Sequence, residues 1–228
     1  MKNSGKARSA AFKMLLVTLV LTLLFPVFGF VATLIGSAMV VFSVVLVGLW
    51  FVFALFVLYF FRDPNPRVPI GTNLVVSPGH GKVDVIDTVH EPRFMGGSCR
   101  RISMFLSVLD VHVQNAPVGG RVAYFRYSEG EFLNAMKTES AEHNENALFG
   151  IEAAEPAGAR VGLRLIAGVL ARRIVPWISV GDEVARGDRI SLIQFGSRVD
   201  LYLPASAKIQ TKLGDRVVGG ETVLAILE

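Results

Sequence analysis

The sequence predicts a membrane-embedded pair of helices followed by a mainly β domain, and three observations indicate this fold class. The segment Met14–Phe61 has no charged residue and is about twice as long as the ~20 apolar residues of one membrane span. A proline-rich stretch, 62–69, follows it. The remainder, 70–228, consists of short apolar or alternating runs bounded by Gly, Pro, Ser or Asp, which is typical of strands.

The apolar segment is predicted to form a transmembrane hairpin with spans at Phe12–Ala32 and Ala38–Phe60. The residues that favour a tight connection between the spans are Pro26, Gly29, Gly36 and Ser37. Basic residues flank both ends of the hairpin, namely Lys2, Lys6, Arg8, Lys13, Arg62 and Arg67. The positive-inside rule therefore places both ends, and the β domain, on the cytoplasmic side of the inner membrane. A cleaved signal peptide, or one long broken helix with the domain outside, is the alternative.

We expect three parts: a membrane anchor over residues 1–61, a linker over 62–69 and a folded domain over 70–228. Prolines at 64, 66 and 69 cannot continue a helix and stiffen the exit from the anchor. The predicted strands are Leu74–Val76, Lys82–Ile86, Arg101–Phe105, Val111–Val113, Gly120–Tyr124, Arg189–Gln194 and Val199–Leu203. Glu129–Thr138 is predicted as a short helix, and Val161–Ile174, apolar on both faces, suits a buried strand.

An internal echo runs through the C-terminal third of the chain. Val180–Asp188 and Leu213–Glu221 both read Gly-Asp-x-Val-x-x-Gly, in which Gly supplies turn dihedrals and Val packs inward. The pattern resembles the β-hammerhead of biotinyl and lipoyl carrier domains, although two ordinary tight turns would explain it equally well. Lys208, which lies between the two units after Pro204-Ala205-Ser206-Ala207, lacks the flanking Met or Asp expected of a carrier lysine.

Charge and cysteine content argue against a nucleic-acid partner and against a disulfide. The net charge of +4 is modest, and no basic stripe interleaved with aromatic residues is present, so we expect no nucleic-acid partner. Cys99 is the only cysteine, so no intrachain disulfide can form, which fits a reducing compartment.

Several motifs, in a fixed order, resemble one family. The run Ile193–Pro204, which contains Phe195-Gly196-Ser197-Arg198, resembles the pyruvoyl-dependent phosphatidylserine decarboxylases in their short, membrane-anchored form. Similar segments occur elsewhere in the chain, at Phe60–Pro64, Met104–Pro117, Asn144-Glu145-Asn146 and Ile166–Ile174. The resemblance covers most of the chain from Phe60 to Glu228.

The resemblance implies that the precursor cuts itself between Gly196 and Ser197. The products would be a large chain, 1–196, and a small chain, 197–228, in which Ser197 has become a pyruvoyl group, the covalent cofactor. The substrate amine forms a Schiff base with the pyruvoyl ketone, which takes up electrons when CO2 leaves. Phosphatidylserine would thus become phosphatidylethanolamine at the membrane, and a homo-oligomer is compatible with this activity.

The resemblance also supplies candidate acid and base residues. His112, within Asp110-Val111-His112, would assist self-processing or protonate the carbanion left by CO2. Asp110 is a candidate to orient His112, because residues two apart on a strand share a face. Other family members place a second His a few residues later, where this chain has Asn115. His90 and His143 are assigned no role.

His80 departs from the family pattern, because Ser77-Pro78-Gly79-His80-Gly81 replaces the usual Ser-Pro-Ala-Asp-Gly. An Asp there would orient His112 and stabilise its charged form. Three interpretations stay open: His80 is itself the processing base; it pairs with His112 while Asp84 or Asp110 supplies charge; or the chain processes slowly or not at all. Since the other motifs are intact, we expect activity.

The Arg172-Arg173 pair has two interpretations, a solvated face or a fork that holds the lipid phosphodiester. Two rival functions also follow from the sequence. A membrane-anchored hammerhead domain could act as a non-enzymatic assembly adaptor. A metal-dependent hydrolase could use His80 and His112, but no ligand-like spacing accompanies them and we expect no metal.

Overall fold

The computed structural model describes residues 5–32, 37–130, 144–168, 173–194 and 197–228. They belong to two compact units, a helical unit over Gly5–Asp63 and a β unit that begins at Pro64 and ends at Glu228.

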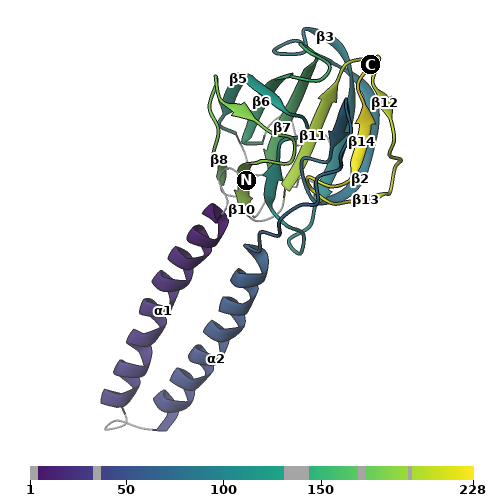
Figure 1. Ribbon diagram of the computed structural model, residues 1–228. Coiled ribbons are helices and arrows are strands. Elements are labelled where there is room, and N and C mark those ends of the chain that lie inside the picture. Colours follow the sequence, from purple (N-terminus) through teal and green to yellow (C-terminus); the bar gives the residue numbers. More distant parts are fainter. Residues whose placement is uncertain (1–4, 33–36, 131–143, 169–172, 195–196) are drawn as a thin grey trace. The chain divides into compact units, whose positions relative to one another are not determined.

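The helical unit consists of α1 (Lys6–Ala32) and α2 (Ser37–Phe60), which lie side by side (Figure 1). Within them, Lys6–Phe30 and Met39–Phe60 are long and apolar enough to cross a membrane, with mean hydropathies of 2.3 and 2.9. The predicted pair of apolar helices is therefore confirmed. The Trp50 indole joins the two helices by donating a 3.1 Å hydrogen bond to the Thr18 hydroxyl.

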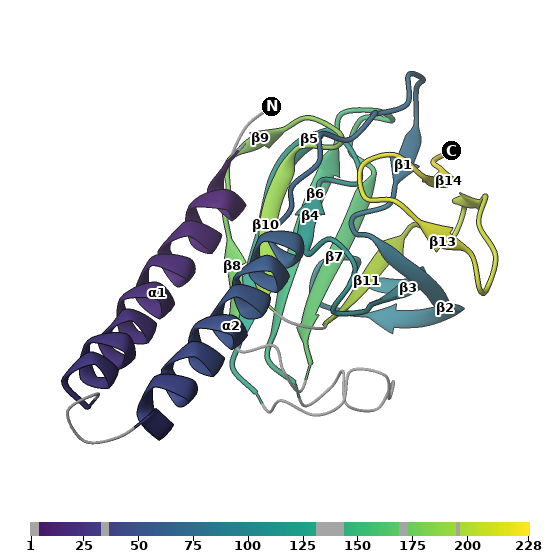
Figure 2. The ribbon, with the colours of Figure 1, turned by 90° about the horizontal axis from the view of Figure 1, so that it is seen from below.

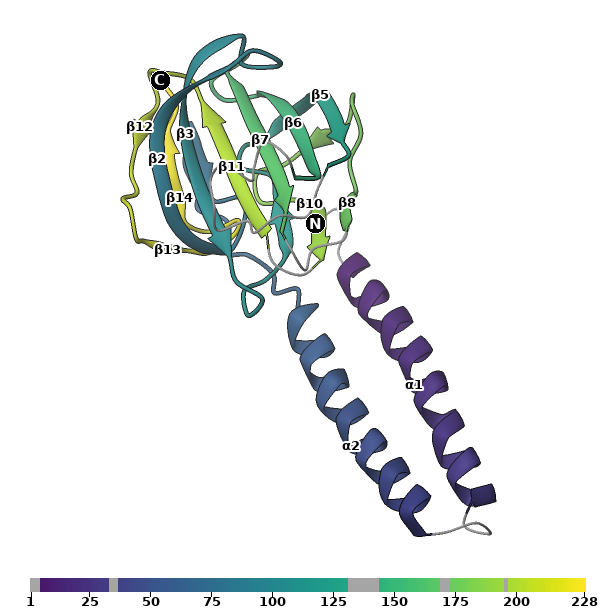
Figure 3. The same cartoon turned by 180° about the vertical axis from the view of Figure 1, so that it is seen from behind.

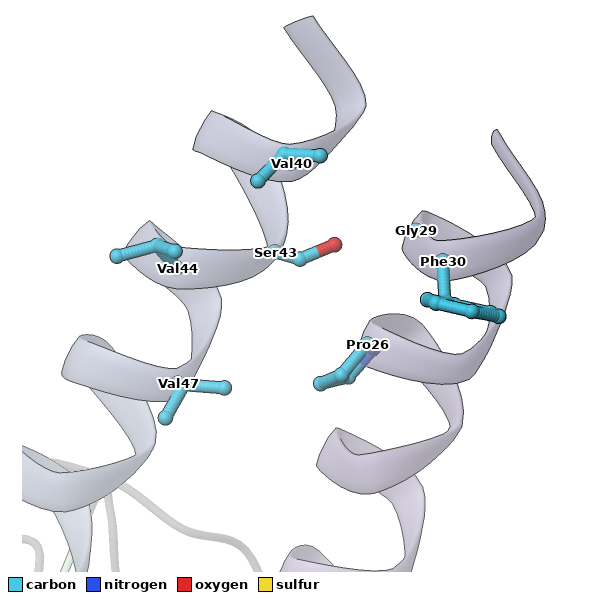
Figure 4. A pocket seen from close by; sticks show the side chains of 7 residues that line it. All are labelled: Pro26, Gly29, Phe30, Val40, Ser43, Val44 and Val47. Atoms are coloured by element: carbon cyan, nitrogen blue, oxygen red, sulfur yellow. The ribbon is translucent and has the colours of Figure 1, made fainter. Parts of the chain in front are cut away.

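Two residues expected to break the chain, Pro26 and Gly29, instead lie inside α1, so that part of the connection prediction is wrong. Proline is tolerated in apolar helices when neighbouring groups satisfy the freed backbone. Gly29 is used for close packing, because a Cβ there would lie 2.3 Å from the Ser43 hydroxyl oxygen of α2. Figure 4 shows Ser43 pointing toward Gly29 across a groove that Pro26 and Val47 also line.

The β unit contains one large and two small antiparallel sheets (Figure 1). In spatial order, the large sheet comprises β13 (Arg216–Val217), β2 (Gly81–Glu91), β3 (Gly97–Leu106), β11 (Ser197–Leu203), β7 (Arg160–Ala167), β6 (Asn146–Ala153), β5 (Gly120–Ser128) and β9 (Glu183–Val184). The small sheets are β1 (Leu74–Val76), β14 (Val223–Ile226) and β12 (Lys208–Ile209), and β4 (Val113–Asn115), β10 (Arg189–Gln194) and β8 (Arg173–Pro176). The large sheet curls (Figure 2). Apolar side chains from all three sheets form the core.

The β unit consists of two equivalent halves. Read inward from its two edges, the large sheet pairs β13 with β9, β2 with β5, β3 with β6 and β11 with β7 as equivalent strands, so its strand order is palindromic. One half comprises β1–β3 and β11–β14, and the other comprises β4–β10, inserted between β3 and β11. The register supports the equivalence, because β2 and β5 have bulges at matching places, Val83/Val85 and Val122/Tyr124. Gly81 and Gly120 also match: a Cβ would lie 2.4 Å from the Phe105 carbonyl oxygen at one and 2.1 Å from that of Glu152 at the other.

The internal echo of the sequence corresponds to one turn in each half. The amide of Gly181 donates a 2.8 Å hydrogen bond to Val122, and the amide of Gly214 donates one of 2.8 Å to Val83. Both glycines have positive φ, at +95° and +91°, which favours glycine over any other residue. The echo therefore reflects duplicated structure rather than two unrelated turns, while the hammerhead assignment stays a prediction.

The predicted strands agree with the observed ones over most of the chain. The bounds of β1 and β10 are those expected, and the other predicted segments lie inside longer strands. Two predictions were wrong in detail. β4 begins at Val113 rather than Val111, and Val161–Ile174 is not one strand, because β7 ends at Ala167 and β8 begins at Arg173. Most of the short helix expected over Glu129–Thr138 lies outside the described residues.

Candidate functional site

Ser197 is the first residue of β11 and is fully buried. Its Cα partners are Leu106 of β3 and Ala167 of β7, and Figures 1 and 3 show β11 between these strands. Within the described part of the chain, its hydroxyl oxygen has no hydrogen-bond partner. Because a buried polar group without a partner costs about 1–3 kcal/mol, such a hydroxyl calls for an explanation beyond stability.

The chain changes sheets immediately before Ser197. β10 ends at Gln194 in a small sheet, paired with β4 and β8, whereas β11 begins at Ser197 in the large sheet. Gly196, the predicted cleavage position, lies outside the described residues. Both flanking strands are hydrogen-bonded on both sides, so a short crossing segment joins two fixed ends.

His112 lies beside this crossing. It is fully buried, and its carbonyl accepts hydrogen bonds from the Ile193 amide at 3.1 Å and the Gln114 side chain at 2.7 Å. Its Nδ1 lies 2.9 Å from the Asp110 carbonyl oxygen. In the neutral ring this contact requires a proton on Nδ1, and Nε2 then carries the lone pair that can accept a proton.

Asp110 orients His112 through its backbone rather than its carboxylate. The carboxylate accepts hydrogen bonds from the amide and hydroxyl of Ser107, both at 2.9 Å, and an ion pair with Arg216 at 3.0 Å. Burial raises the pKa of Asp110, but these hydrogen bonds and Arg216 bring it below its ordinary value. The expectation that Asp110 and His112 share a strand face was wrong, because both residues precede β4.

His80 approaches the same region from the loop between β1 and β2. A Cβ on Gly219 would lie 3.0 Å from the ring of His80 and 2.8 Å from the side-chain oxygen of Asn115, so the two side chains flank one glycine. The backbone amide of Asn115 donates a 2.8 Å hydrogen bond to the Pro78 carbonyl. The loop that carries the half-buried His80 is thus hydrogen-bonded to β4, the strand that directly follows His112.

Two carboxylates that could have supplied charge to the histidines are engaged by arginines. Asp84 binds Arg198, whose Nη1 lies 3.1 Å from Oδ1, and Arg198 is 1% exposed. Burial raises the pKa of Asp84 above its ordinary value, although Arg198 opposes this change. Asp110 is held by Arg216, as described above.

A buried polar segment missed as part of the site supports β7 opposite Ser197. The Asn144 side-chain amide donates a 2.7 Å hydrogen bond to the Ala167 carbonyl, and the Ala167 amide donates one of 2.9 Å to the Glu145 carbonyl. The Glu145 carboxylate accepts the Ile174 amide of β8 at 3.2 Å and the Tyr127 hydroxyl. β8 pairs with β10, so this segment holds the neighbours of both strands that flank the crossing. A polar run that directly begins an apolar strand was the available sequence signal.

The candidate phosphate contacts are only partly described. Arg173 is the first residue of β8, is exposed, and is the Cα partner of Gln194 at the end of β10. Arg172 lies outside the described residues. Arg173 is therefore close in register to the crossing.

The duplicated half provides an internal comparison for the site. In one half, Lys82, Phe105 and Arg198 are successive Cα partners across β2, β3 and β11, and Arg121, Glu152 and Arg160 are their equivalents across β5, β6 and β7. Ser197, which precedes Arg198, therefore corresponds to Ala159, which precedes Arg160. By the same register, Gly196 corresponds to Gly158. His112 directly precedes β4 and Asn73 directly precedes β1, so these two residues are equivalent. In the same way, His80 directly precedes β2 and Gly119 directly precedes β5. Only one half carries the hydroxyl and both imidazoles.

Comparison with known proteins gives a consistent result. The family model described as phosphatidylserine decarboxylase matches residues 53–225. A phosphatidylserine decarboxylase proenzyme of Symbiobacterium thermophilum is 47% identical over 174 residues, which is 76% of this chain and 80% of that protein. The proenzyme of Zymomonas mobilis is 44% identical over 209 residues, 86% of this chain and 82% of that protein. That of Desulfotalea psychrophila is 42% identical over 179 residues, with 77% and 83% covered.

Proposed function

Because the chain belongs to the phosphatidylserine decarboxylase family, we propose that it removes the carboxyl group of phosphatidylserine and produces phosphatidylethanolamine. One observation carries the proposal at the level of residues. The hydroxyl of Ser197 is buried without a partner among the described residues, at the crossing between two sheets. The relatives are named proenzymes, which supports a precursor that must be processed before it acts.

The Ser197 hydroxyl is the proposed nucleophile of processing. Its oxygen attacks the carbonyl carbon of Gly196, the amide bond between the two residues breaks, and an ester forms. Nε2 of His112 accepts the hydroxyl proton, because the contact of Nδ1 with the Asp110 carbonyl leaves the lone pair on Nε2. Elimination across Cα–Cβ of residue 197 then breaks the ester and leaves Gly196 as a carboxylate. Tautomerisation and hydrolysis release ammonia and leave a pyruvoyl group.

The site fits a pyruvoyl group at position 197. The position is fully buried and bordered by Leu106 and Ala167, so the small, uncharged ketone would be protected from bulk water. The group supplies a carbonyl that combines with the substrate amine and withdraws the electron pair released with CO2. Arg198, to which the group would be joined, is held in register between β3 and β7.

Other residues of this chain have distinct proposed roles. His112, fixed by Asp110, returns a proton to the substrate carbon after CO2 has left. His80 borders the same region from its place beside Asn115, and its proposed role is to pair with His112 during processing. Arg172 and Arg173 supply a positive fork for the lipid phosphodiester, since planar guanidinium groups bind phosphate oxygens bidentately.

The enzyme is membrane-associated, because two of its helices are long and apolar enough to cross a bilayer. We further propose the inner membrane, with both helix ends and the β unit in the cytoplasm, because the basic residues lie outside the apolar segment. Anchoring suits this reaction, since substrate and product both stay in the bilayer. The relatives named above are enzyme precursors, so the non-enzymatic adaptor gains no support.

The proposed activity is tested with the purified full chain in mixed micelles that contain phosphatidylserine. We expect phosphatidylethanolamine and CO2 in equal amounts from the wild type, and neither from the Ser197→Ala variant. If the wild type forms no phosphatidylethanolamine, or if Ser197→Ala forms it at the wild-type rate, the proposal is wrong.

A further inference from the structure

One end of the large sheet presents basic and apolar side chains together on its surface. The row Ser197–Leu106 continues through Gly81 to Val217, and β13 lies beyond it at the sheet edge. With strands ~4.8 Å apart, Val217 is about 14 Å from Ser197 along this row. The turns around this end carry the rim surface, which we define as Lys82, Leu109, Lys212, Leu213 and Arg216.

Hydrogen bonds and ion pairs connect the turns of the rim surface. Arg216, on β13, binds the carboxylate of Asp110 at 3.0 Å and so joins the 212–216 segment to the turn that carries Leu109. Lys82 is the Cα partner of Arg216, and its Cε lies 4.0 Å from where a Cβ on Gly214 would be. The rim surface is therefore one connected patch, and it adjoins the Asp110 carbonyl that orients His112.

The apolar side chains of the rim surface are exposed at the tips of tight turns. Leu109 is 59% and Leu213 is 61% exposed. Each tip is held rigidly: the Asp110 amide donates to the Ser107 carbonyl at 2.9 Å, and the Asp215 carboxylate accepts the Lys212 amide at 3.0 Å. These hydrogen bonds keep both leucine side chains exposed to solvent instead of packed against the domain. Exposed apolar side chains that lie together mark surfaces that bind a membrane or another protein.

The three cationic side chains of the rim surface are exposed, and Arg216 is the one that is paired with a carboxylate. The Arg216 side chain is 73% exposed, and Lys82 and Lys212 are exposed and make no ion pair within the described ranges of the chain. Asp110 shares its carboxylate between Ser107 and Arg216, and Asp215 binds the amide of Lys212 and the hydroxyl of Thr211, so the two lysines keep the charge that no carboxylate pairs with among the described residues. The outward charge of the rim surface is therefore positive.

The equivalent turn of the other half shows which features are inherent in the fold. Val180 corresponds to Leu213 and is 58% exposed, so an apolar tip belongs to this turn in both halves. Its neighbours differ, because Ser179 and Glu183 stand where the rim surface has Lys212 and Arg216. Val180 also belongs to the opposite end of the sheet, where β9 pairs with β5. Of the three cations of the rim surface, Lys212 and Arg216 are thus specific to this end of the sheet, whereas Lys82 has the exposed Arg121 as its equivalent in the other half.

We propose that the rim surface docks the β unit onto an anionic lipid bilayer, with Leu109 and Leu213 entering the headgroup region. Lys82, Lys212 and Arg216 attract the anionic headgroups, and the leucines contribute apolar burial, the two terms that govern interfacial binding. The consequence for catalysis rests on the proposed function: docking presents an anionic, serine-containing headgroup to the end of the sheet where β11 begins.

The docking is tested directly with an environment-sensitive dye on the full chain in nanodiscs. Leu213→Cys and Val180→Cys give matched labelling sites on equivalent turns, and the natural Cys99 is 1% exposed and shielded from the dye. We expect a blue shift of dye emission at position 213 when phosphatidylglycerol is added to phosphatidylcholine nanodiscs, and no such shift at position 180. No shift at position 213, or equal shifts at both positions, overturns the proposal.

A second experiment connects docking to turnover. For Leu213→Ser combined with Lys212→Gln, the ratio of turnover of bilayer phosphatidylserine to turnover of a monomeric short-chain analogue should fall about fivefold. Val180→Ser should leave this ratio at the wild-type value. An unchanged ratio in the double variant contradicts docking by the rim surface. If the wild type turns over neither substrate, the proposed function fails, whereas the dye experiment, which uses a lipid that is not decarboxylated, still tests docking.

Discussion

The side-chain amide of Asn144 donates a 2.7 Å hydrogen bond to the carbonyl of Ala167, the residue that faces Ser197 across β7 and β11. Both groups are buried, so water cannot replace either partner. Together with Glu145, which binds the Ile174 amide of β8, Asn144 holds the strands next to the proposed scissile bond from one side. This support fixes β7 next to Ser197 and β8 next to β10 on either side of the proposed cleavage position.

Asn144→Asp should slow self-processing by about tenfold or more. The substitution removes the donor and places an acceptor against the Ala167 carbonyl, and an unsatisfied buried pair costs about 1–3 kcal/mol. Processing is followed as the loss of full-length precursor on denaturing gels during expression or refolding. Gln210→Glu is the matched control, because it makes the same amide-to-carboxylate change at an exposed position. Equal processing rates for Asn144→Asp and the wild type would show that this hydrogen bond does not support the crossing.

Asp110→Asn should destabilise the β unit by about 1–2 kcal/mol at neutral pH, since charged hydrogen bonds to Ser107 and Arg216 are weakened. The pKa of Asp110 is lowered in the folded state from 3.8. Its carboxylate therefore contributes stability that is complete above pH 3.8 and is lost as the pH falls through the lowered value. Melting curves in a Ser197→Ala background, which keeps the chain in one piece, should show the difference at pH 7 and its disappearance in acid. A difference that stays constant with pH would contradict this role.

His80→Asp should process at least as completely as the wild type. The family pattern described above has Asp at this position, and a carboxylate stabilises a protonated His112 better than a second imidazole does. The fraction of processed chain on a gel checks the expectation, with His90→Asp as the control for the same change at an exposed histidine. Accumulation of full-length His80→Asp would mean that the region around Asn115 and Gly219 has adapted to imidazole.

Ala159→Ser should not create a second cleavage site. It gives the equivalent position the sequence Gly-Ser-Arg-Val, identical to 196–199, but Asn73 and Gly119 stand where the working half has His112 and His80. The intact mass of the variant should show a cut after Gly196 only. A fragment that begins at residue 159 would demonstrate that a Gly-Ser step in this register is sufficient for processing and that the histidines are not needed.

The sequence predicted the local elements well, but it did not predict which strands pair. The bounds of β1 and β10 could be read from short apolar runs, and the two helices from uncharged length, because these signals are local. Pro26 and Gly29 misled, because in α1 Gly29 permits contact with Ser43 of another helix. The palindromic strand order depends on contacts between residues far apart in the chain. The Gly-Asp-x-Val echo marks one turn of each half and does not indicate how the strands pair.

The same limit applies to the candidate site. Ser197, His112 and His80 came from motifs, and the structure places their segments around one crossing. The use of the Asp110 carbonyl, rather than its carboxylate, depends on a turn that ends before β4 begins. Asn144 and Glu145 support the site through Ala167 and Ile174, and no spacing rule in the sequence connects those pairs.

The central claim is that Ser197 becomes the reactive end of a small chain, and the intact mass of the active, purified protein tests it most directly. The account predicts two chains, residues 1–196 and 197–228, the smaller one lacking a free α-amine and lighter than the uncut sequence by the change from serine to pyruvoyl. A single unbroken chain of 228 residues that decarboxylates phosphatidylserine at full rate would contradict it.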